Sequence, residues 1–494
     1  MRNYLLLLIW MTALGLSGAT SARCGASTLT IGVGRDFYDG PESRSYLHGS
    51  THTWEALTRL GPDLQAEPWL AHAWSGTDDG RTWTFHLRDG VLFHDGTPLT
   101  AGMAAASIRR IASHPRYDAS GVYRYLDHME TRGRLTLVFH LKEPSPAFPN
   151  LVAYYSSPIL HPKTFDNGGR LIGLTGTGPF AVAAVRPGDR ITLTAFPSYW
   201  GKKPLFDQVV FRMLPDAQAR IMALRSGDID AVSDVGGILP RQVAALQQAK
   251  GITLKSVPVA TTHYLLFNCN KPPFASRQAR QWIRNRIGPD DLKAVLVSGV
   301  GKAATDPYTP LATPWTFHSL KPEPGTCPTD KTLPVTILLH AGTLERWPYR
   351  DLAVILQARL AESGFRASIR IREPGAYYED IRTGQFDMAL QPNTLMTGDP
   401  DFFYSYYVAS DGPRNCGCGD PAMDNLIDQG RKSMHAQERK AIYRRLSSLF
   451  NQSLPLLPLY HDIAYYAHGP GVTDFEMDYN FRPLLTQARP QEKP

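Results

Sequence analysis

Hydrophobic and polar residues alternate most regularly between positions 83 and 100. The apolar residues of 83–87 are separated by polar ones, which is the period-2 pattern of a strand with one buried face. An Asp-Gly pair follows this run and another follows a second apolar run at 91–93, so the pattern predicts a hairpin. An alanine-rich segment then begins, and Thr100 is placed to cap a helix there.

Along the rest of the chain, apolar residues recur either with the period of a strand or with the period of a helix. Predicted strands include 29–33, 135–141, 180–185, 190–195, 208–213, 336–340, 368–371, 386–390 and 459–468. Predicted helices include 54–60, 101–112, 217–226, 352–360, 377–382 and 422–451. Asp216 and Gly227 are suited to begin and end the helix at 217–226. Alternation of strands and helices predicts an α/β fold.

Length and charge change this picture in two ways. The 494 residues exceed what one hydrophobic core usually organises, so we expect two or three subdomains. The formal charge of +7 is spread along the chain without a block of like charges. This distribution gives no support to a nucleic-acid partner.

The first residues predict export from the cytoplasm. Arg2 precedes an apolar run at 5–16, and small residues follow up to Ala22. This is the layout of a secretory signal peptide, predicted here as residues 1–22. Cys24 follows Arg23, whereas a lipidated cysteine follows a small residue, so we expect a soluble periplasmic protein.

Cysteine and histidine spacing leaves two metal hypotheses open. Cys416 and Cys418 could chelate a soft metal ion, but we favour a structural disulfide, either local or to Cys269 or Cys327. A pair of histidines four residues apart, His48 and His52, could share a helix face and bind metal. We favour a histidine pair with a structural role, and predict no metal site.

Several sequence blocks occur together in the order typical of one family. The chain resembles the bacterial extracellular solute-binding proteins of family 5, which serve peptide and nickel ABC importers. The blocks that carry the resemblance are 83–100, 176–180 (GTGPF), 199–204 (YWGKKP), 211–220, 226–230 (SGDID), 268–274 and 399–403 (DPDFF).

The resemblance implies a two-lobed periplasmic-binding-protein fold of α/β class, with discontinuous lobes, hinge strands and an extra α+β subdomain. Ligand would be held in a cleft that closes between the lobes. The implied boundaries are 27–54, 173–265 and 465–494 for lobe I, 55–172 for the extra subdomain and 266–464 for lobe II.

The resemblance also implies ligand-binding positions. A buried zwitterionic peptide needs a cation for its carboxylate and an anion for its amine. Arg346 matches the carboxylate-binding position of dipeptide-binding relatives. Their acidic residue for the amine has no counterpart in the loop that contains Asn393 and Met396, although Asp399 follows closely. This loop predicts a more apolar pocket than that of the peptide-binding relatives.

Nickel-type relatives bind a metal with a small chelator whose carboxylates meet arginines. Arg116 is a rough match to one of those arginines, whereas the stretch 154–157 holds no arginine for the second. Phe37 and Tyr264 correspond to aromatic positions that face the cleft in relatives. Binding of a metal-chelator complex is therefore the alternative to binding of a peptide-like solute.

Enzyme motifs are missing from the sequence. It contains no HExxH or GxSxG, and the Gly-Thr-Gly at 176–178 lacks the Lys-Ser/Thr of a phosphate-binding loop. We therefore predict a solute-binding component of an ABC importer, without enzymatic activity or cofactor. Its partners would be a small solute and permease subunits in the inner membrane, and we expect a monomer. A secreted hydrolase and a ligand sensor are the hypotheses from other classes.

Overall fold

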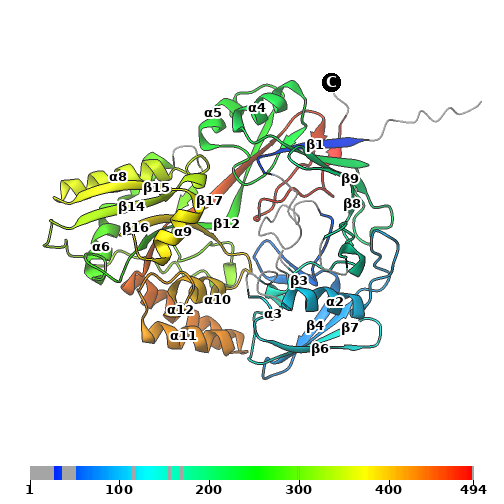
Figure 1. Cartoon of the computed structure of the whole chain (residues 1–494), viewed down its shortest axis with the longest axis horizontal. Coiled ribbons are helices and arrows are strands. Elements are labelled where there is room, and N and C mark those ends of the chain that lie inside the picture. The colour runs from blue at the N-terminus through cyan, green and yellow to red at the C-terminus, as the bar shows by residue number, and fades with distance from the viewer. Residues whose placement is uncertain are drawn as a thin grey trace, which may run out of the picture.

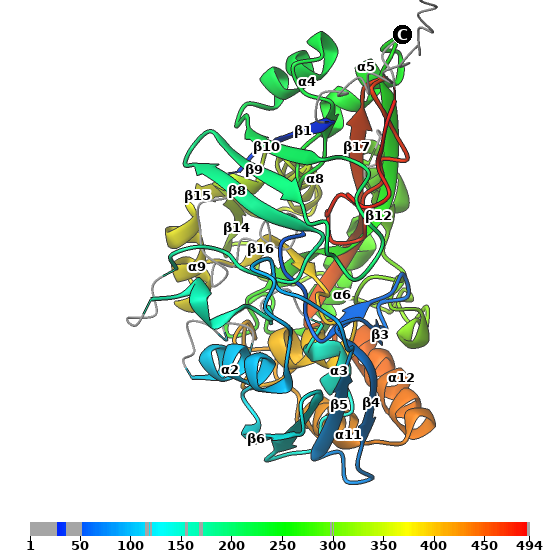
Figure 2. The same cartoon turned by 90° about the vertical axis from the view of Figure 1, so that its right-hand side faces the viewer.

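The computed structural model describes residues 27–35, 52–113, 118, 121–153, 157–166, 171–296, 299 and 301–491. The predicted signal peptide lies outside the described residues. Two α/β halves lie side by side, and a smaller subdomain lies below one of them and beside the other (Figure 1). The view at 90° shows the small subdomain at one end of the molecule (Figure 2).

One mixed sheet runs through both halves. In spatial order its strands are β15 (Arg366–Arg372), β14 (Pro334–His340), β16 (Met388–Thr394), β12 (Thr253–Phe267), β17 (Leu456–His468), β11 (Ala231–Val232), β1 (Thr28–Val33), β10 (Gln208–Met213), β9 (Arg190–Ala195) and β8 (Phe180–Arg186), with β13 (Gly301–Ala303) paired to β17. Parallel pairing joins β14 to β15 and β16, and joins β1 to β10 and β11.

Helices cover this sheet and form a separate layer near the small subdomain. They are α4 (Ala217–Ser226), α5 (Val243–Gln247), α6 (Arg277–Arg286), α7 (Pro289–Val295), α8 (Tyr349–Glu362), α9 (Pro374–Arg382), α10 (Pro400–Phe403), α11 (Pro421–Lys432) and α12 (Ala436–Ser453). Within the described part of the chain, we find no helix with the length and apolarity needed to cross a bilayer.

Two long antiparallel strands connect the halves. β12 and β17 pair from Thr253 opposite His468 to Leu266 opposite Leu456. One end of β17 joins β11 in the first half, and the other end of β12 joins β16 in the second. Both strands can be followed from half to half in Figure 1. The α/β class and the connecting strands therefore agree with the sequence prediction.

The small subdomain is built on a four-stranded antiparallel sheet and one main helix. Its elements are β4 (Ala71–Gly76), β5 (Thr82–Leu87), β7 (Thr136–Leu141), β6 (Leu126–Arg132), α2 (Ala101–Ala112), α3 (Phe148–Leu151) and the pair β2 (Thr58–Leu60) and β3 (Ala66–Pro68). The side chains of Trp83, Phe85 and Leu87 are buried as predicted, and Thr100 accepts a hydrogen bond from Met103 N at 3.3 Å.

Three predicted elements are wrong. The run 91–93 forms only one bridge, between Leu92 and Pro98, because β5 pairs with β4 and β7 instead. The helix predicted at 422–451 is two helices, α11 and α12, and the turn between them lets Tyr443 pack on Gly430. The stretch 54–60 is extended rather than helical, and it contains β2.

A close approach of two backbones explains the extended stretch. A Cβ atom added to Gly178 would lie 2.1 Å from the carbonyl oxygen of His52, so only glycine fits there. The Gly-Thr-Gly sequence thus holds the 176–178 loop against residues 52–54. The same contact brings Thr177 to Glu55, whose carboxylate accepts hydrogen bonds from Thr177 Oγ1, Tyr199 Oη and Trp200 Nε1 at 2.8, 2.8 and 2.9 Å.

Burial of Glu55 predicts a pH-dependent stability. Desolvation raises the pKa of this carboxyl group from 4.5 to about 7. The folded protein therefore holds this proton more tightly than the unfolded chain, so the contribution of Glu55 to stability should fall as pH rises from about 4.5 to about 7. The expected loss is about 3 kcal/mol.

Urea denaturation at pH 5, 6, 7 and 8 measures this effect. Glu55→Gln mimics the neutral carboxyl group, so the stability of the wild type relative to this variant should fall between pH 5 and 7, while the buried His52 affects both proteins alike. A Glu55→Gln variant with the same pH slope as the wild type would contradict the assignment to Glu55.

Candidate functional site

A cleft lies between the small subdomain and the second half of the protein. Its volume is about 780 Å³, within the range of small-molecule sites. One wall comes from Asp118 and residues 121–151 of the small subdomain, and the other comes from β16, the segment 396–414 and helices α11 and α12. Segments far apart in sequence therefore build one site.

A buried ion pair supports the second wall. Asp399 is 4% exposed and caps α10, accepting a hydrogen bond from Asp401 N. Both of its carboxylate oxygens lie 2.7 Å from guanidinium nitrogens of Arg439, whose Nε donates to Gly430 O at 2.7 Å. The bidentate geometry fixes the start of α10 relative to α11 and α12.

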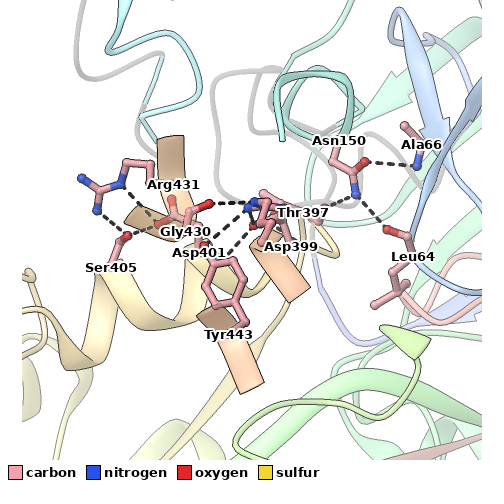
Figure 3. Close-up of polar contacts among 11 residues, drawn as sticks. Leu64, Ala66, Asn150, Thr397, Asp399, Asp401, Ser405, Gly430, Arg431 and Tyr443 are labelled. Carbon is pink, nitrogen blue, oxygen red and sulfur yellow. Dashed lines mark hydrogen bonds and ion pairs between the residues drawn. The ribbon is translucent and has the colours of Figure 1, made fainter. Parts of the chain in front are cut away.

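A second, less buried pair lies beside it. Arg431 Nε is 3.3 Å from Asp401 Oδ1, and Arg431 Nη2 donates to Ser405 Oγ at 2.6 Å. Figure 3 shows Arg431, Asp401 and Ser405 grouped next to Asp399. Asp401 is therefore also charge-compensated.

The two walls touch each other at the edge of the cleft. Asn150 Nδ2 donates to Leu64 O and to Thr397 O at 2.9 Å each, and Asn150 Oδ1 accepts from Ala66 N at 3.2 Å (Figure 3). Asn150 thus joins the small subdomain to the loop after β16. The structure is accordingly a form in which the subdomain and the second half are in contact.

Aromatic and amide side chains line the space between the walls. Phe402 and Tyr406 stack with ring centroids 6.1 Å apart, and Tyr125 lies on the opposite wall. Gln391 is 6% exposed and donates from Nε2 to Tyr407 Oη at 2.6 Å. Its Oε1 has no hydrogen-bond partner among the described residues. Such a lining offers an apolar surface with a few polar groups to a small solute.

Three predicted site residues come together in this cleft. Asn393, Met396 and Asp399 all line it, although the Asp399 carboxylate is already saturated by Arg439. Phe37 and Arg116 lie outside the described residues, so their predicted roles stay predictions.

Two other predicted residues lie elsewhere. Arg346 lines a separate cavity of about 30 Å³ with Asp234 and Asp462, and its side chain lies against Gly236. Tyr264 is fully buried in the core of the second half, where its hydroxyl donates to Pro307 O at 2.7 Å. Neither residue is brought to the large cleft.

Four arginines that line the cleft were not predicted from the sequence: Arg124, Arg414, Arg431 and Arg439. Arg124 lies between two tyrosines, and Arg414 lies between a tyrosine-rich stretch and the Cys-Gly-Cys sequence. These neighbours are the local signals that could have drawn attention to the two positions. No periodicity connects them, because they belong to different walls.

The cysteine and histidine hypotheses are answered in part. Cys269 and Cys418 form a disulfide, whereas Cys327 and Cys416 are free thiols. His52 lies in a turn, its ring nitrogen contacts Pro483 O, and burial lowers its pKa to about 4. His48 lies outside the described residues. Within the described ranges, no group of three or more His, Cys, Asp or Glu side chains is arranged to hold a metal ion.

Comparisons with known proteins agree with this architecture. The family described as bacterial extracellular solute-binding proteins, family 5 Middle, matches residues 65–415. Di/tripeptide-binding protein 2 of Pseudomonas aeruginosa is 25% identical, covering 94% of this chain and 95% of that protein. The glutathione-binding protein GsiB of Escherichia coli O1:K1 / APEC is 24% identical over the same shares of the two chains.

The fold is shared with solved two-lobed periplasmic binding proteins. NikA of Brucella suis, crystallised with Fe(III)-EDTA, superposes with a TM-score of 0.81 at 22% identity, covering 94% of this chain and all of that one. The predicted two-lobed α/β fold is therefore confirmed, and its residue boundaries stay a prediction. Since the family match spans most of the sequence, the chain belongs to the bacterial extracellular solute-binding proteins of family 5.

Proposed function

We propose that this protein is the periplasmic solute-binding component of an ABC importer and delivers a small peptide-like solute to a membrane permease. The observation that carries the proposal is the cleft of about 780 Å³ between two walls that contact each other through Asn150. A solute enclosed there would contact both walls at once, so binding would favour the closed arrangement that a permease recognises.

The lining supports a peptide-like solute. Aromatic faces at Tyr125, Phe402 and Tyr406 suit apolar groups, and the arginines suit carboxylates. The names of the peptide- and glutathione-binding relatives point to the same class of solute. The complex of NikA with Fe(III)-EDTA makes a metal chelate the second candidate, because carboxylates of a chelator would also meet arginines.

Identification of the bound solute tests the proposal. The protein is purified from the periplasm without dialysis, and the solute released on denaturation is identified by mass spectrometry together with metal analysis. We expect a small peptide-like molecule, whereas a metal with a chelator would select the alternative. The intact mass of the same sample shows whether cleavage follows Ala22.

A thermal-shift screen with a peptide pool gives an independent measurement. A ligand present at about 100 times its dissociation constant adds about 2.7 kcal/mol to stability, which raises the melting temperature measurably. Cleavage of the peptides by protease-free protein would contradict the proposal in favour of a hydrolase. Unchanged solute uptake after deletion of the gene would contradict it in favour of a sensor.

A further inference from the structure

Two of the arginines in the cleft have no carboxylate partner within 4 Å among the described residues. Arg124 comes from the small subdomain, and Arg414 comes from the loop that follows residues 404–408 in the second half. Both side chains line the same cleft from its two walls. Arg431 and Arg439, by contrast, are paired with Asp401 and Asp399.

The loop of Arg414 is held in place by its neighbours. Arg414 N donates to Tyr406 O at 3.0 Å, and its guanidinium carbon lies 4.5 Å from the centre of the Tyr378 ring. Asn415 Nδ2 donates to Val408 O and Ala409 O. A guanidinium group stacked on a ring keeps its edge N–H groups available as donors.

Arg124 is held by a turn of the opposite wall. Asp118 shapes this turn, because its carboxylate accepts hydrogen bonds from Val122 N and Tyr123 N at 2.7 and 2.8 Å. The Arg124 guanidinium lies 4.6 Å from the centre of the Tyr125 ring. Asp118 is close enough for its charge to act on Arg124, but the two form no ion pair.

Acidic groups in the cleft are already engaged. Asp399 faces Arg439, Asp401 faces Arg431, and Asp118 faces two backbone N–H groups. Among the described lining residues, an ammonium group of a solute would therefore meet no carboxylate that lacks a hydrogen-bond partner, and an ammonium group buried without a partner is costly. Two carboxylates of a solute, however, would find two guanidinium groups.

We infer that this cleft selects solutes with two carboxylates and no free amine, held at one wall by Arg124 and at the other by Arg414. This inference rests on the proposed solute-binding function and specifies its substrate class. Amine-blocked acidic peptides and polycarboxylate chelators share this chemistry. A solute that bridges both arginines also draws the two walls together, so recognition and closure depend on the same pair of groups.

Calorimetric titration with three matched peptides tests the inference. N-acetyl-Ala-Glu has two carboxylates and no amine, N-acetyl-Ala-Gln has one carboxylate, and Ala-Ala is a zwitterion. We expect N-acetyl-Ala-Glu to bind at least tenfold more tightly than either of the others. Titration with citrate, with and without Ni²⁺, tests whether the solute is a metal chelate and not a peptide. Tighter binding of the nickel–citrate complex than of N-acetyl-Ala-Glu would assign the arginine pair to chelates.

Substitutions of the two arginines test whether these residues cause the preference for N-acetyl-Ala-Glu. Arg124→Gln and Arg414→Gln should each remove most of the tenfold preference and leave the melting temperature of the ligand-free protein nearly unchanged. The matched control is Arg132→Gln, which removes a surface guanidinium paired with Glu130 on β6 and should retain the preference.

Two results would overturn the inference without touching the proposed function. One is binding of Ala-Ala as tight as that of N-acetyl-Ala-Glu, and the other is an unchanged preference in both cleft variants. If none of these ligands binds, the inference is also overturned, whereas the proposed function is decided separately by the solute recovered from the periplasm.

Discussion

Replacement of Arg439 by methionine is expected to lower the free energy of unfolding by about 3–5 kcal/mol, because it leaves a buried carboxylate without its cation. Asp399 is 4% exposed, and each of its oxygens lies 2.7 Å from a guanidinium nitrogen. Arg439 also lies 4.9 Å from the Trp315 ring centre, so its removal takes away packing as well as charge. Urea denaturation measures the loss.

Two variants separate the charge effect from general damage. The double variant Asp399→Asn, Arg439→Met no longer buries an unpaired charge, so it should lose less stability than the sum of the two single variants. Arg431→Met removes the more exposed guanidinium of α11, which faces Asp401 at 3.3 Å, and should cost less than Arg439→Met. A loss below about 1 kcal/mol in Arg439→Met would contradict a stabilising role of this pair.

Local signals in the sequence predicted much of the fold. Helix α4 lies at the predicted residues because Asp216 accepts a hydrogen bond from Ala219 N and Gly227 adopts a positive φ of 80° at its end. The strand at 83–87 was likewise predicted from the alternation of its own apolar and polar residues. These elements depend on neighbours in sequence, and such dependence can be read without knowledge of the fold.

Long-range contacts explain the features that local sequence patterns did not predict. The stretch 54–60 is extended because the 176–178 loop packs against it from more than a hundred residues away. The partner of Asp399 lies on α12, forty residues further along the chain. The carboxylate-binding role predicted for Arg346 followed from the resemblance to dipeptide-binding relatives. Arg124 and Arg414 lie on different walls, so they line one cleft only when the two walls meet.

Removal of the disulfide is the second change with a large expected effect. Cys269 and Cys418 are 149 residues apart, and loss of a native disulfide that closes a long loop costs about 2–5 kcal/mol. Reductant should therefore lower the melting temperature of the wild type. The Cys327→Ser and Cys416→Ser variants should respond to reductant as the wild type does, since both of these thiols are free.

The double variant Cys269→Ser, Cys418→Ser should melt at the lower temperature with or without reductant. Reductant insensitivity of Cys416→Ser alone would contradict the pairing and place Cys416 in the bond. Since the disulfide holds the end of the loop that carries Arg414, it should also matter for binding. We expect reduction to weaken the affinity for N-acetyl-Ala-Glu more than that for N-acetyl-Ala-Gln, because only the first ligand needs both arginines in place.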